Sequence, residues 1–389
     1  MARTKKANKA SGSSAVAKSR FTRPGNGLII LLFSIFSAAG LWLMRVETGI
    51  KDIPVGFMDQ LENAKYHNGV PLRQVYTGIE ALDLFRYLVP AFIAGPLAWD
   101  EGVRVQQLHF LVQYFAVVCL WNIEACRSRN ARRIFSYTGL FAVLYQTIGG
   151  AVIVPLWFLS FLVSSKSDNY YQSGRQVNLP HARGILFAVV VGYLVPTLAM
   201  FTPGMNPETA QLLTFIWQPA PTFVNLLLFL SSLLLPATAA RGERTPDVKY
   251  LKRVYNVAGL VAAINHLATV YICYTSSNPE LSFTHVFIPN RNTWTDSATL
   301  GLHYIFQVDW WGCFTPSLIF AFISVWDAHR ILLGGASATQ LIGWAIYILG
   351  LTAAIGPGGM LAVVWSWRED RLTMIETGVR GTIKKPKTA

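Results

Sequence analysis

Long apolar runs recur along the whole chain and alternate with shorter polar segments. An α-helix needs roughly 20 mainly apolar residues to cross a bilayer, and most of these runs approach or exceed that length. The pattern therefore predicts transmembrane helices from one end of the chain to the other. The clear spans that we expect are Gly27–Met44, Leu108–Ile123, Phe135–Val163, Gly184–Phe201, Val254–Tyr274, Gly301–Trp326 and Gln340–Trp365.

Two further apolar segments are irregular. Leu82–Trp99 contains Arg86 and two prolines, so we expect a short span or an interfacial segment there. Thr209–Pro236 is interrupted by the run Trp217–Pro221, whose two prolines remove backbone donors and kink a helix. Lipid tolerates such a break only where the freed carbonyls face protein or a cavity. Together the segments predict an all-α fold, a polytopic transmembrane bundle of about eight helices within a range of about seven to nine.

Composition agrees with a membrane protein, and the charge lies mainly at the two ends. Hydrophobic residues make up 52% of the 389 residues and charged residues only 14%, against roughly 25% in soluble domains. We divide the chain into a basic tail over residues 1–26, a bundle over 27–366 and a second basic tail over 367–389. Basic tails of this kind usually face the cytosol and anionic membrane lipid. The net charge of +13 is not joined to a folded basic face, so we expect no nucleic-acid partner.

The basic loops conflict with this set of spans. Cytosolic loops carry an excess of Lys and Arg, which favours placing residues 127–133 and 241–253 on one side of the membrane. Three predicted spans separate these loops, whereas an even number is required. We expect the broken Thr209–Pro236 segment to be the exception, as a re-entrant loop or paired half-helices. Lys385 and Lys387 resemble a dilysine retrieval signal, which predicts the membrane of the endoplasmic reticulum.

Asp309 is the carboxylate that stands out within the spans. It lies in the apolar run Leu302–Phe314, and no Lys or Arg shares its helix stripe. A carboxyl at membrane depth is costly and is therefore a functional candidate, and desolvation favours its protonated form. A protonated acid could start reactions of an alkene or an epoxide, with the rings of Trp310 and Trp311 facing a developing carbocation. The alternative is that Asp309 lies near the interface and bonds to a backbone amide or to His303.

Other polar residues within the spans give weaker signals. Glu124, at the end of a span, could be a second catalytic carboxyl, although we slightly favour its pairing with Arg127 or Arg129. Mid-span Asn265 and His266 either join helices by hydrogen bonds or hold a polar headgroup and accept a final proton. Gln218, Asn225 and Gln146 either bind a phenol or quinone oxygen or satisfy one another. The residues that we predict to bind substrate are Trp310, Trp311, His303, Asn265, His266, Trp217 and Gln218.

Several well-known site motifs are missing from the sequence. There is no DDxxD or NSE run for a magnesium-bound diphosphate, and no GxxxxGK[ST], GxGxxG, HExxH or GxSxG signature. No histidine pair within a span has haem or di-iron spacing, so we predict no metal and no cofactor. The four cysteines have no zinc-type spacing with histidines and are expected to be buried thiols. Acid catalysis and transport are the function classes that remain.

With these features the chain resembles the membrane-bound terpene cyclases of fungal meroterpenoid biosynthesis, of the ascofuranone and macrophorin type. The resemblance is carried by the basic N-terminal tail, the early single span, the break at Trp217-Gln218-Pro219, the pair Asn265-His266 and the run Val308-Asp309-Trp310-Trp311. It implies cyclisation of a farnesyl chain, often attached to an aromatic or quinone-like head.

In that family the reaction would begin by protonation of an epoxide or a terminal alkene, without loss of diphosphate. The resemblance therefore implies a class II-like cyclase of isomerase or lyase type, with a prenylated small-molecule substrate. A pathway prenyltransferase and an epoxidase would be its partners. We assign the proton-donor role to Asp309, with Glu124 as the second catalytic candidate.

Two other functions fit part of the pattern. Broken helices and mid-membrane polar residues also occur in transporters, so the chain could carry lipophilic metabolites or couple transport to protons. The sequence has no visible inverted repeat, which argues against that class. A non-catalytic membrane scaffold is the third option, and it would leave Asp309 without a purpose.

Overall fold

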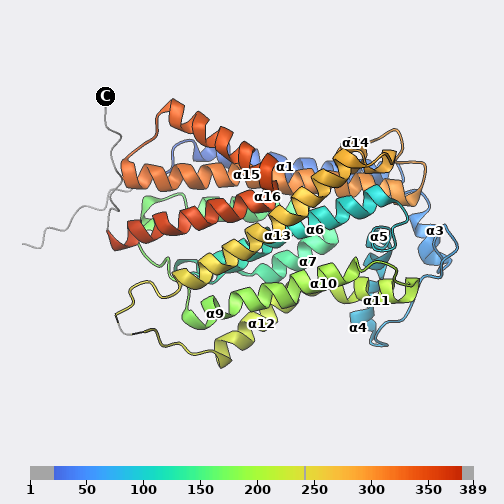
Figure 1. Ribbon diagram of the computed structural model, residues 1–389, viewed down its shortest axis with the longest axis horizontal. Helices are drawn as coiled ribbons and strands as arrows, with labels where there is room; N and C mark the ends of the chain where they lie inside the picture. Colours follow the sequence, from blue (N-terminus) through green and yellow to red (C-terminus); the bar gives the residue numbers. More distant parts are fainter. Residues whose placement is uncertain (1–21, 241, 379–389) are drawn as a thin grey trace, which may run out of the picture.

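The computed structural model describes residues 22–240 and 242–378. These residues form an all-helical bundle without strands, which confirms the predicted fold class (Figure 1). The proposed retrieval signal at Lys385 and Lys387, and most of the N-terminal basic tail, lie outside the described residues. The longer helices are α1 (Asn26–Leu41), α6 (Glu101–Ala125), α7 (Thr138–Ile148), α8 (Gly150–Ser164), α9 (Leu179–Val189), α11 (Pro207–Trp217), α12 (Ala220–Leu234), α13 (Val248–Thr275), α15 (Ala298–Leu333) and α16 (Ala338–Thr377).

Short helices complete the membrane helices or lie outside them. Single π-turns join α1 to α2 and α9 to α10, so each pair forms one continuous helix. Among the described residues, six helices are long and apolar enough to cross a membrane, and the pair α11–α12, bent by 52°, would make a seventh. The short helices are α2 (Glu47–Ile50), α3 (Phe57–Glu62), α4 (Glu80–Asp83), α5 (Val89–Phe92), α10 (Val195–Met200) and α14 (Phe283–Phe287).

The predicted span Phe135–Val163 is instead a helical hairpin. Helix α7 ends at Ile148 and α8 begins at Gly150, because Gly149 adopts φ 121°. The indole nitrogen of Trp157 in α8 donates to the carbonyl of Phe135, just before α7, at 2.9 Å. Helix α8 therefore runs back to the end of the bundle where α7 began. The hydrophobic pattern missed this reversal because both arms are equally apolar.

Helix α16 also turns back in its middle. Gly356 leaves helical geometry with φ 77° and ψ 165°. Figure 1 shows the second half of α16, in red, returning to the end where the helix began. Trp344 and Trp367 line one cavity of about 150 Å³, so the two halves lie close together. The predicted span Gln340–Trp365 is therefore not one straight helix, because it reverses at the glycine-rich run that begins at Gly356.

The α7–α8 hairpin resolves the conflict over the basic loops. Gln211 in α11 bonds to the backbone of Arg73 at one end of the bundle, whereas Arg183 bonds to the carbonyl of Pro236 at the other. The pair α11–α12 therefore crosses, and our expectation that Thr209–Pro236 is re-entrant is wrong. The α7–α8 hairpin is the exception, since it adds no crossing. We name the end that holds Arg127 and Arg183 the basic end.

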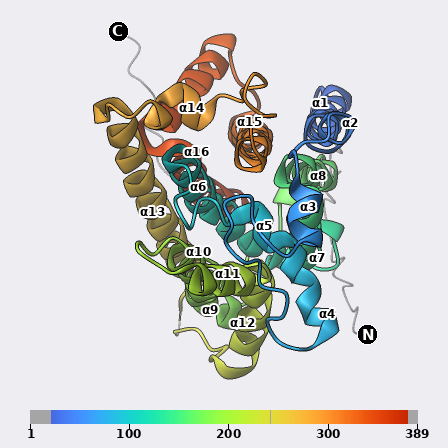
Figure 2. The same ribbon diagram turned by 90° about the vertical axis from the view of Figure 1, so that its right-hand side faces the viewer.

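The segment Leu82–Trp99 lies at the opposite end and does not span. It contains α4, a 3₁₀ turn over Leu84–Leu88 and α5, which lie beside α11 (Figure 2). Its prolines and short helices leave it too short to cross, so it caps the bundle and sends Phe92 into the interior. Phe92 contacts Trp217 and Phe306 with ring centroids 4.9 Å apart in both cases.

Aromatic stacking fills the core between α6, α8 and α15. The rings of Trp121 and Trp157 stack at 4.9 Å, and those of Phe158 and Phe320 stack at 4.2 Å. All four side chains are almost completely buried. The four cysteines are free thiols, and all but the half-buried Cys126 are buried, as expected. This packing holds α8 firmly against α15, the helix that carries Asp309.

The reversal of α16 predicts a specific sensitivity at Gly356. A Cβ there would lie 2.5 Å from Gln113 Oε1, and φ 77° disfavours any side chain. We expect Gly356→Ala to lower the free energy of unfolding by about 1–3 kcal/mol, measured by thermal melting in detergent. Gly350→Ala is the control, because nothing lies within 4 Å of that position and alanine favours a helix. Equal stability of the two variants would contradict the role of the turn.

Candidate active site

A cavity lined mainly by aromatic rings lies between α6, α7, α11 and α15, and Asp309 is the carboxylate on its wall. We call it the aromatic cavity. It is small, with a volume of about 40 Å³. Its wall contains Phe92, Phe110, Leu111, Tyr114, Tyr145, Gln146, Gly150, Tyr193, Trp217, Phe306 and Asp309.

The break between α7 and α8 positions Asp309. Helix α8 begins there, and its first backbone N–H groups have no partner within the helix. Asp309 Oδ1 accepts a hydrogen bond from the amide of Ala151 at 2.5 Å, and Cys313 Sγ lies 3.9 Å away. A Cβ on Gly150 would lie only 3.2 Å from Oδ1, so glycine permits this approach. The backbone-amide alternative for Asp309 is therefore observed, and His303 is not its partner.

The second oxygen of Asp309 has no hydrogen-bond partner among the described residues. No Lys or Arg of the described chain forms a salt bridge with this carboxyl. The nearest cation in the same break is Arg45, which donates to the carbonyls of Ile148 and Thr147 at 2.8 and 2.9 Å. Arg45 thus donates to the free carbonyls at the end of α7, while Asp309 accepts from a free amide at the start of α8. The Asp309 side chain is anchored through Oδ1, and Oδ2 is left for a ligand.

Of the predicted substrate-binding residues, one lines this cavity and a second contacts a residue of its wall. Trp217 lines it and donates its indole N–H to Thr197 Oγ1 at 2.9 Å. Gln218 accepts a hydrogen bond from Gln146, also on the wall, at 2.9 Å. The contact between these two amides was one of the alternatives that we weighed. It leaves Gln218 Nε2 buried without a partner among the described residues.

The tyrosines of the wall were missed by the sequence analysis. The hydroxyls of Tyr114 and Tyr145 are buried and have no partner among the described residues, whereas Tyr193 donates to the carbonyl of Leu111 at 3.0 Å. Buried polar groups are normally bonded to protein or ordered water, so these two hydroxyls mark places where water or a ligand binds. Single tyrosines in apolar helices gave no periodic signal, because their convergence depends on how α6 and α7 pack.

Trp310 and His266 lie outside the aromatic cavity, in a hydrogen-bonded chain. The indole of Trp310 donates to His109 Nδ1 at 3.2 Å, so His109 carries its proton on Nε2. His109 Nε2 then donates to His266 Nδ1 at 3.2 Å, and His266 Nε2 donates to the carbonyl of Ala353 at 3.1 Å. Every ring nitrogen of these three side chains takes part in a hydrogen bond. The last of these bonds satisfies the carbonyl of Ala353, near the end of the first half of α16. Acceptance of a final proton by His266 would first require one of these bonds to break.

Asn265 belongs to the same structural cluster. Gln113 donates to Asn265 Oδ1 at 3.2 Å and to the carbonyl of Ala262 at 2.7 Å. The side-chain oxygen of Gln113, Oε1, accepts a hydrogen bond from the backbone amide of Gly358 at 2.9 Å. Gly358 lies in the first turn of the returning half of α16. Asn265 therefore helps to hold α6, α13 and α16 together, and it is not among the residues that line the aromatic cavity.

Trp311 and His303 also lie away from the aromatic cavity. Trp311 is on the outer surface, with 44% of its side chain exposed, and donates to the carbonyl of Phe287 at 2.8 Å. His303 is buried near the end opposite the basic end, with its ring centroid 5.0 Å from that of His285. Neighbouring residues on a helix point in different directions, which explains why Asp309 and the two tryptophans separate.

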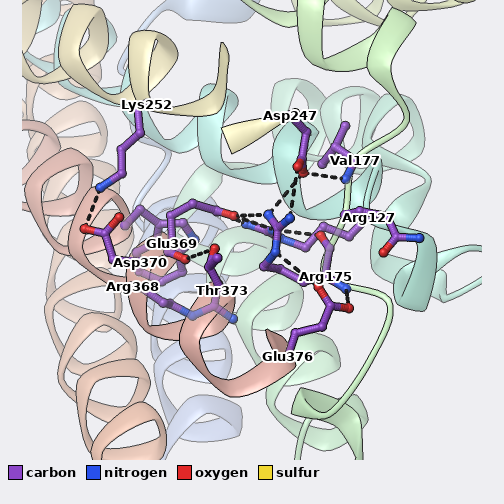
Figure 3. A network of polar contacts seen from close by, with 12 residues as sticks. Arg127, Arg175, Val177, Asp247, Lys252, Arg368, Glu369, Asp370, Thr373 and Glu376 are labelled. Atoms are coloured by element: carbon purple, nitrogen blue, oxygen red, sulfur yellow. Dashed lines mark hydrogen bonds and ion pairs between the residues drawn. The ribbon is translucent and has the colours of Figure 1, made fainter. Parts of the chain in front are cut away.

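Glu124 lies in a buried ion network at the basic end. Figure 3 shows the part of this network around Arg127, Arg175 and Glu369. Its Oε1 accepts from Arg127 at 3.0 Å and from Arg368 at 2.8 Å. Glu369 extends the network to Arg127 at 2.5 Å and to Arg175 at 2.6 Å. The pairing with Arg127 that we favoured is observed, although Glu124 is fully buried instead of interfacial. It is not among the residues that line the aromatic cavity, so the expected second carboxyl across the pocket is absent from that wall.

Comparison with known proteins places this architecture in a family. The sequence model of the CtvD domain matches residues 26–373. The chain belongs to the CtvD domain family. The CtvD match covers the aromatic cavity, the ion network and both hairpins, and it confirms the resemblance to the fungal membrane-bound terpene cyclases.

Curated relatives of this CtvD-domain chain are distant but extensive. It is 27% identical to "Terpene cyclase ascI" of Acremonium egyptiacum over 258 residues, which are 64% of the chain and 67% of the relative. It is 26% identical to "Terpene cyclase DEP1" of Alternaria brassicicola over 385 residues, 87% of the chain and 98% of the relative. "Terpene cyclase ctvD" of Aspergillus terreus is 32% identical over 180 residues, 44% and 52% of the two chains. No solved structure matches the CtvD-domain chain.

The ion network predicts that Glu124 acts on stability. Removing one partner of a buried ion pair leaves an uncompensated charge and typically costs about 3–5 kcal/mol. We therefore expect Glu124→Gln to melt at a much lower temperature in detergent, while the folded fraction keeps its turnover. Glu243→Gln is the control, because its pair with Lys249 is partly exposed and should contribute about 1 kcal/mol or less. Normal stability with lost turnover would instead make Glu124 catalytic.

The pair His285 and Asp100, outside the membrane helices, predicts a pH dependence. The hydrogen bond to Asp100 Oδ1 at 3.4 Å, with help from Glu280, raises the pKa of His285 above its usual value. Stability from this pair is present below about pH 6.5 and is lost as the pH rises through the raised pKa. We expect the melting temperature at low salt to fall across that window. Asp100→Asn, which can still accept the amide of Val103, should flatten the profile.

Proposed function

We propose that the protein is an acid-initiated terpene cyclase that works inside the membrane. Asp309 would protonate an epoxide or an alkene of a farnesyl chain on a meroterpenoid precursor, without loss of diphosphate. The observation that carries this proposal is a carboxyl anchored to the start of α8 on the wall of an aromatic cavity, with no side-chain hydrogen bond to its second oxygen from the described residues. The names of the relatives in the CtvD domain family support the reaction class.

The geometry supplies the groups that this chemistry needs. Asp309 Oδ2 would give its proton to the epoxide oxygen as the C–O bond breaks and an internal alkene forms the first carbon–carbon bond. Positive charge then moves along the chain, and the π-faces of Phe306, Trp217 and Tyr193 would stabilise it. Loss of a proton from the last carbocation then gives a neutral product and offsets the proton that the acid added. Tight aromatic packing keeps water from trapping the cation early.

The polar atoms of the wall support an epoxide as the group that is protonated. The hydroxyls of Tyr114 and Tyr145 on the wall are donors without a partner among the described residues, and so is the amide nitrogen of Gln218, which contacts the wall residue Gln146. A bare alkene would leave them unsatisfied once water is excluded, whereas an epoxide oxygen and the resulting hydroxyl would accept their hydrogen bonds. A relative named "FAD-dependent monooxygenase verC1" of Penicillium polonicum is 24% identical over 66% of this chain, which is only 31% of its own length. We propose an epoxidase as a pathway partner because the reaction would need an epoxidised substrate.

The cellular setting follows from the same reaction. A prenyltransferase would supply the lipophilic substrate, which would partition into the membrane with the cyclase. We propose the endoplasmic reticulum as the location, with the basic end in the cytosol, because loops rich in Arg and Lys usually stay there.

Transport is the second candidate, because half-helices that meet at mid-depth are typical of carriers. The breaks at Gly149 and Gly356 provide that feature. The two functions differ in what they require. Product formation by purified protein in detergent, where no sealed compartment exists, would establish the cyclase and exclude transport as the sole activity.

The proposal predicts the behaviour of Asp309→Asn. Asparagine keeps an oxygen for the amide of Ala151 but has no carboxylic proton, so the fold should persist while general-acid catalysis, worth about 10²- to 10⁴-fold, is lost. The measurement is product formed from the prenylated, epoxidised substrate in microsomes that contain equal amounts of protein. The exposed Asp296→Asn should behave like the wild type. Full turnover by Asp309→Asn would remove this residue from the mechanism.

A further inference from the structure

A second, larger cavity lies on the outer surface between α15 and the first half of α16. We call it the outer groove. Its volume is about 590 Å³, which is in the usual range for sites that bind organic ligands. The aromatic cavity, with about 40 Å³, cannot hold a farnesyl chain in this conformation. The outer groove is lined by residues such as Trp310, Phe314, Phe322, Ala345, Ala353 and Pro357.

Three of the four polar side chains that line the outer groove are bonded within the protein, and the fourth, the hydroxyl of Thr315, has no partner among the described residues. The indole of Trp310 donates to His109, and that of Trp311 donates to the carbonyl of Phe287. The hydroxyl of Thr352 donates to the carbonyl of Ile348 at 2.8 Å. These three groups therefore have no donor to spare for a ligand, and the rest of the lining is almost entirely hydrocarbon. The outer groove fits an apolar chain better than a polar head.

The outer groove and the aromatic cavity share a thin wall. Phe314 lines the outer groove and Phe110 lines the aromatic cavity, and their rings meet edge to face with centroids 5.9 Å apart. Trp310 and Asp309 are adjacent residues of α15 that face the two spaces separately. A rotation of the Phe314 ring would join the outer groove to the carboxyl. The route from the bilayer to Asp309 therefore crosses one pair of rings.

We propose, resting on the cyclase function above, that the outer groove receives the isoprenoid chain of the substrate directly from the bilayer. The reactive terminus passes between Phe110 and Phe314 to reach Asp309, and the rest of the chain lies along α15. Trp310 and Phe322 are twelve residues apart, about 18 Å along the helix, so the outer groove is long enough for an extended prenyl chain. The polar head then lies toward the basic end, at the membrane interface.

Filling the outer groove tests the proposal. Ala345 lines it, whereas Ala354 is exposed on the same helix and does not. We expect Ala345→Phe to raise KM for a C15 substrate about tenfold or more, because displaced methylenes in an apolar site carry effects of that size. A C10 analogue, which reaches less far along α15, should be affected less. Ala354→Phe should match the wild type for both substrates, and equal KM values for Ala345→Phe and Ala354→Phe would overturn the proposal.

Photolabelling separates this proposal from the catalytic one. A farnesyl chain that carries a diazirine should label peptides over residues 318–322 and 345–349 in wild type and Ala354→Phe, and much less in Ala345→Phe. If a fatty-acyl diazirine labels the same residues and competes equally with the farnesyl probe, the outer groove holds membrane lipid and the proposal is overturned. Farnesyl labelling together with full turnover by Asp309→Asn would refute the catalytic acid while leaving the outer groove assigned.

Discussion

Backbone groups freed at two mid-helix breaks constrain the rest of the bundle. A peptide group without a partner is costly in hydrocarbon, so each break needs a donor for its carbonyls and an acceptor for its amides. Arg45 and Asp309 provide them between α7 and α8, and His266 and Gln113 provide them within α16. Both breaks lie against the middle of α6, where Gln113 and Tyr114 are adjacent. Helix α6 is buried along almost its whole length and carries buried polar side chains that include His109, Gln113 and Glu124.

The same constraint separates two kinds of buried charge. At the basic end, Glu124 and Glu369 lie between arginines, so their carboxyls are neutralised in pairs and serve packing. Asp309 has a helix terminus as its partner instead, which holds one oxygen and leaves the other unused by the described protein. A site built on the ends of rigid helices keeps its geometry better than one on a loop. The aromatic packing of α8 against α15 supplies that rigidity.

The sequence predicts the helices well, because helix formation and membrane burial follow local hydrophobicity. It does not predict their direction at Gly149, since a reversal depends on partners such as Arg45 and Asp309 from distant segments. Asp309 was found from the cost of a carboxyl in lipid, and Trp217 and Gln218 from the proline break. Tyr114 and Tyr145 were missed, and the sequence did not show that Trp310 and Asp309 face different spaces, because only packing decides which space each neighbour faces.

The comparison of the two breaks argues for chemistry at one of them. If the breaks had only to satisfy backbone groups, a neutral amide would be sufficient, and Gln113 plays that part for Gly358. The amide of Ala151 is met instead by an ionisable carboxyl, whose desolvation is expensive, beside unpartnered tyrosine hydroxyls and a ring of aromatic faces. A structural cap does not explain that cost, and the proposed role of Asp309 as a proton donor would. The α16 break, with its closed chain of neutral hydrogen bonds, serves as the internal reference for this argument.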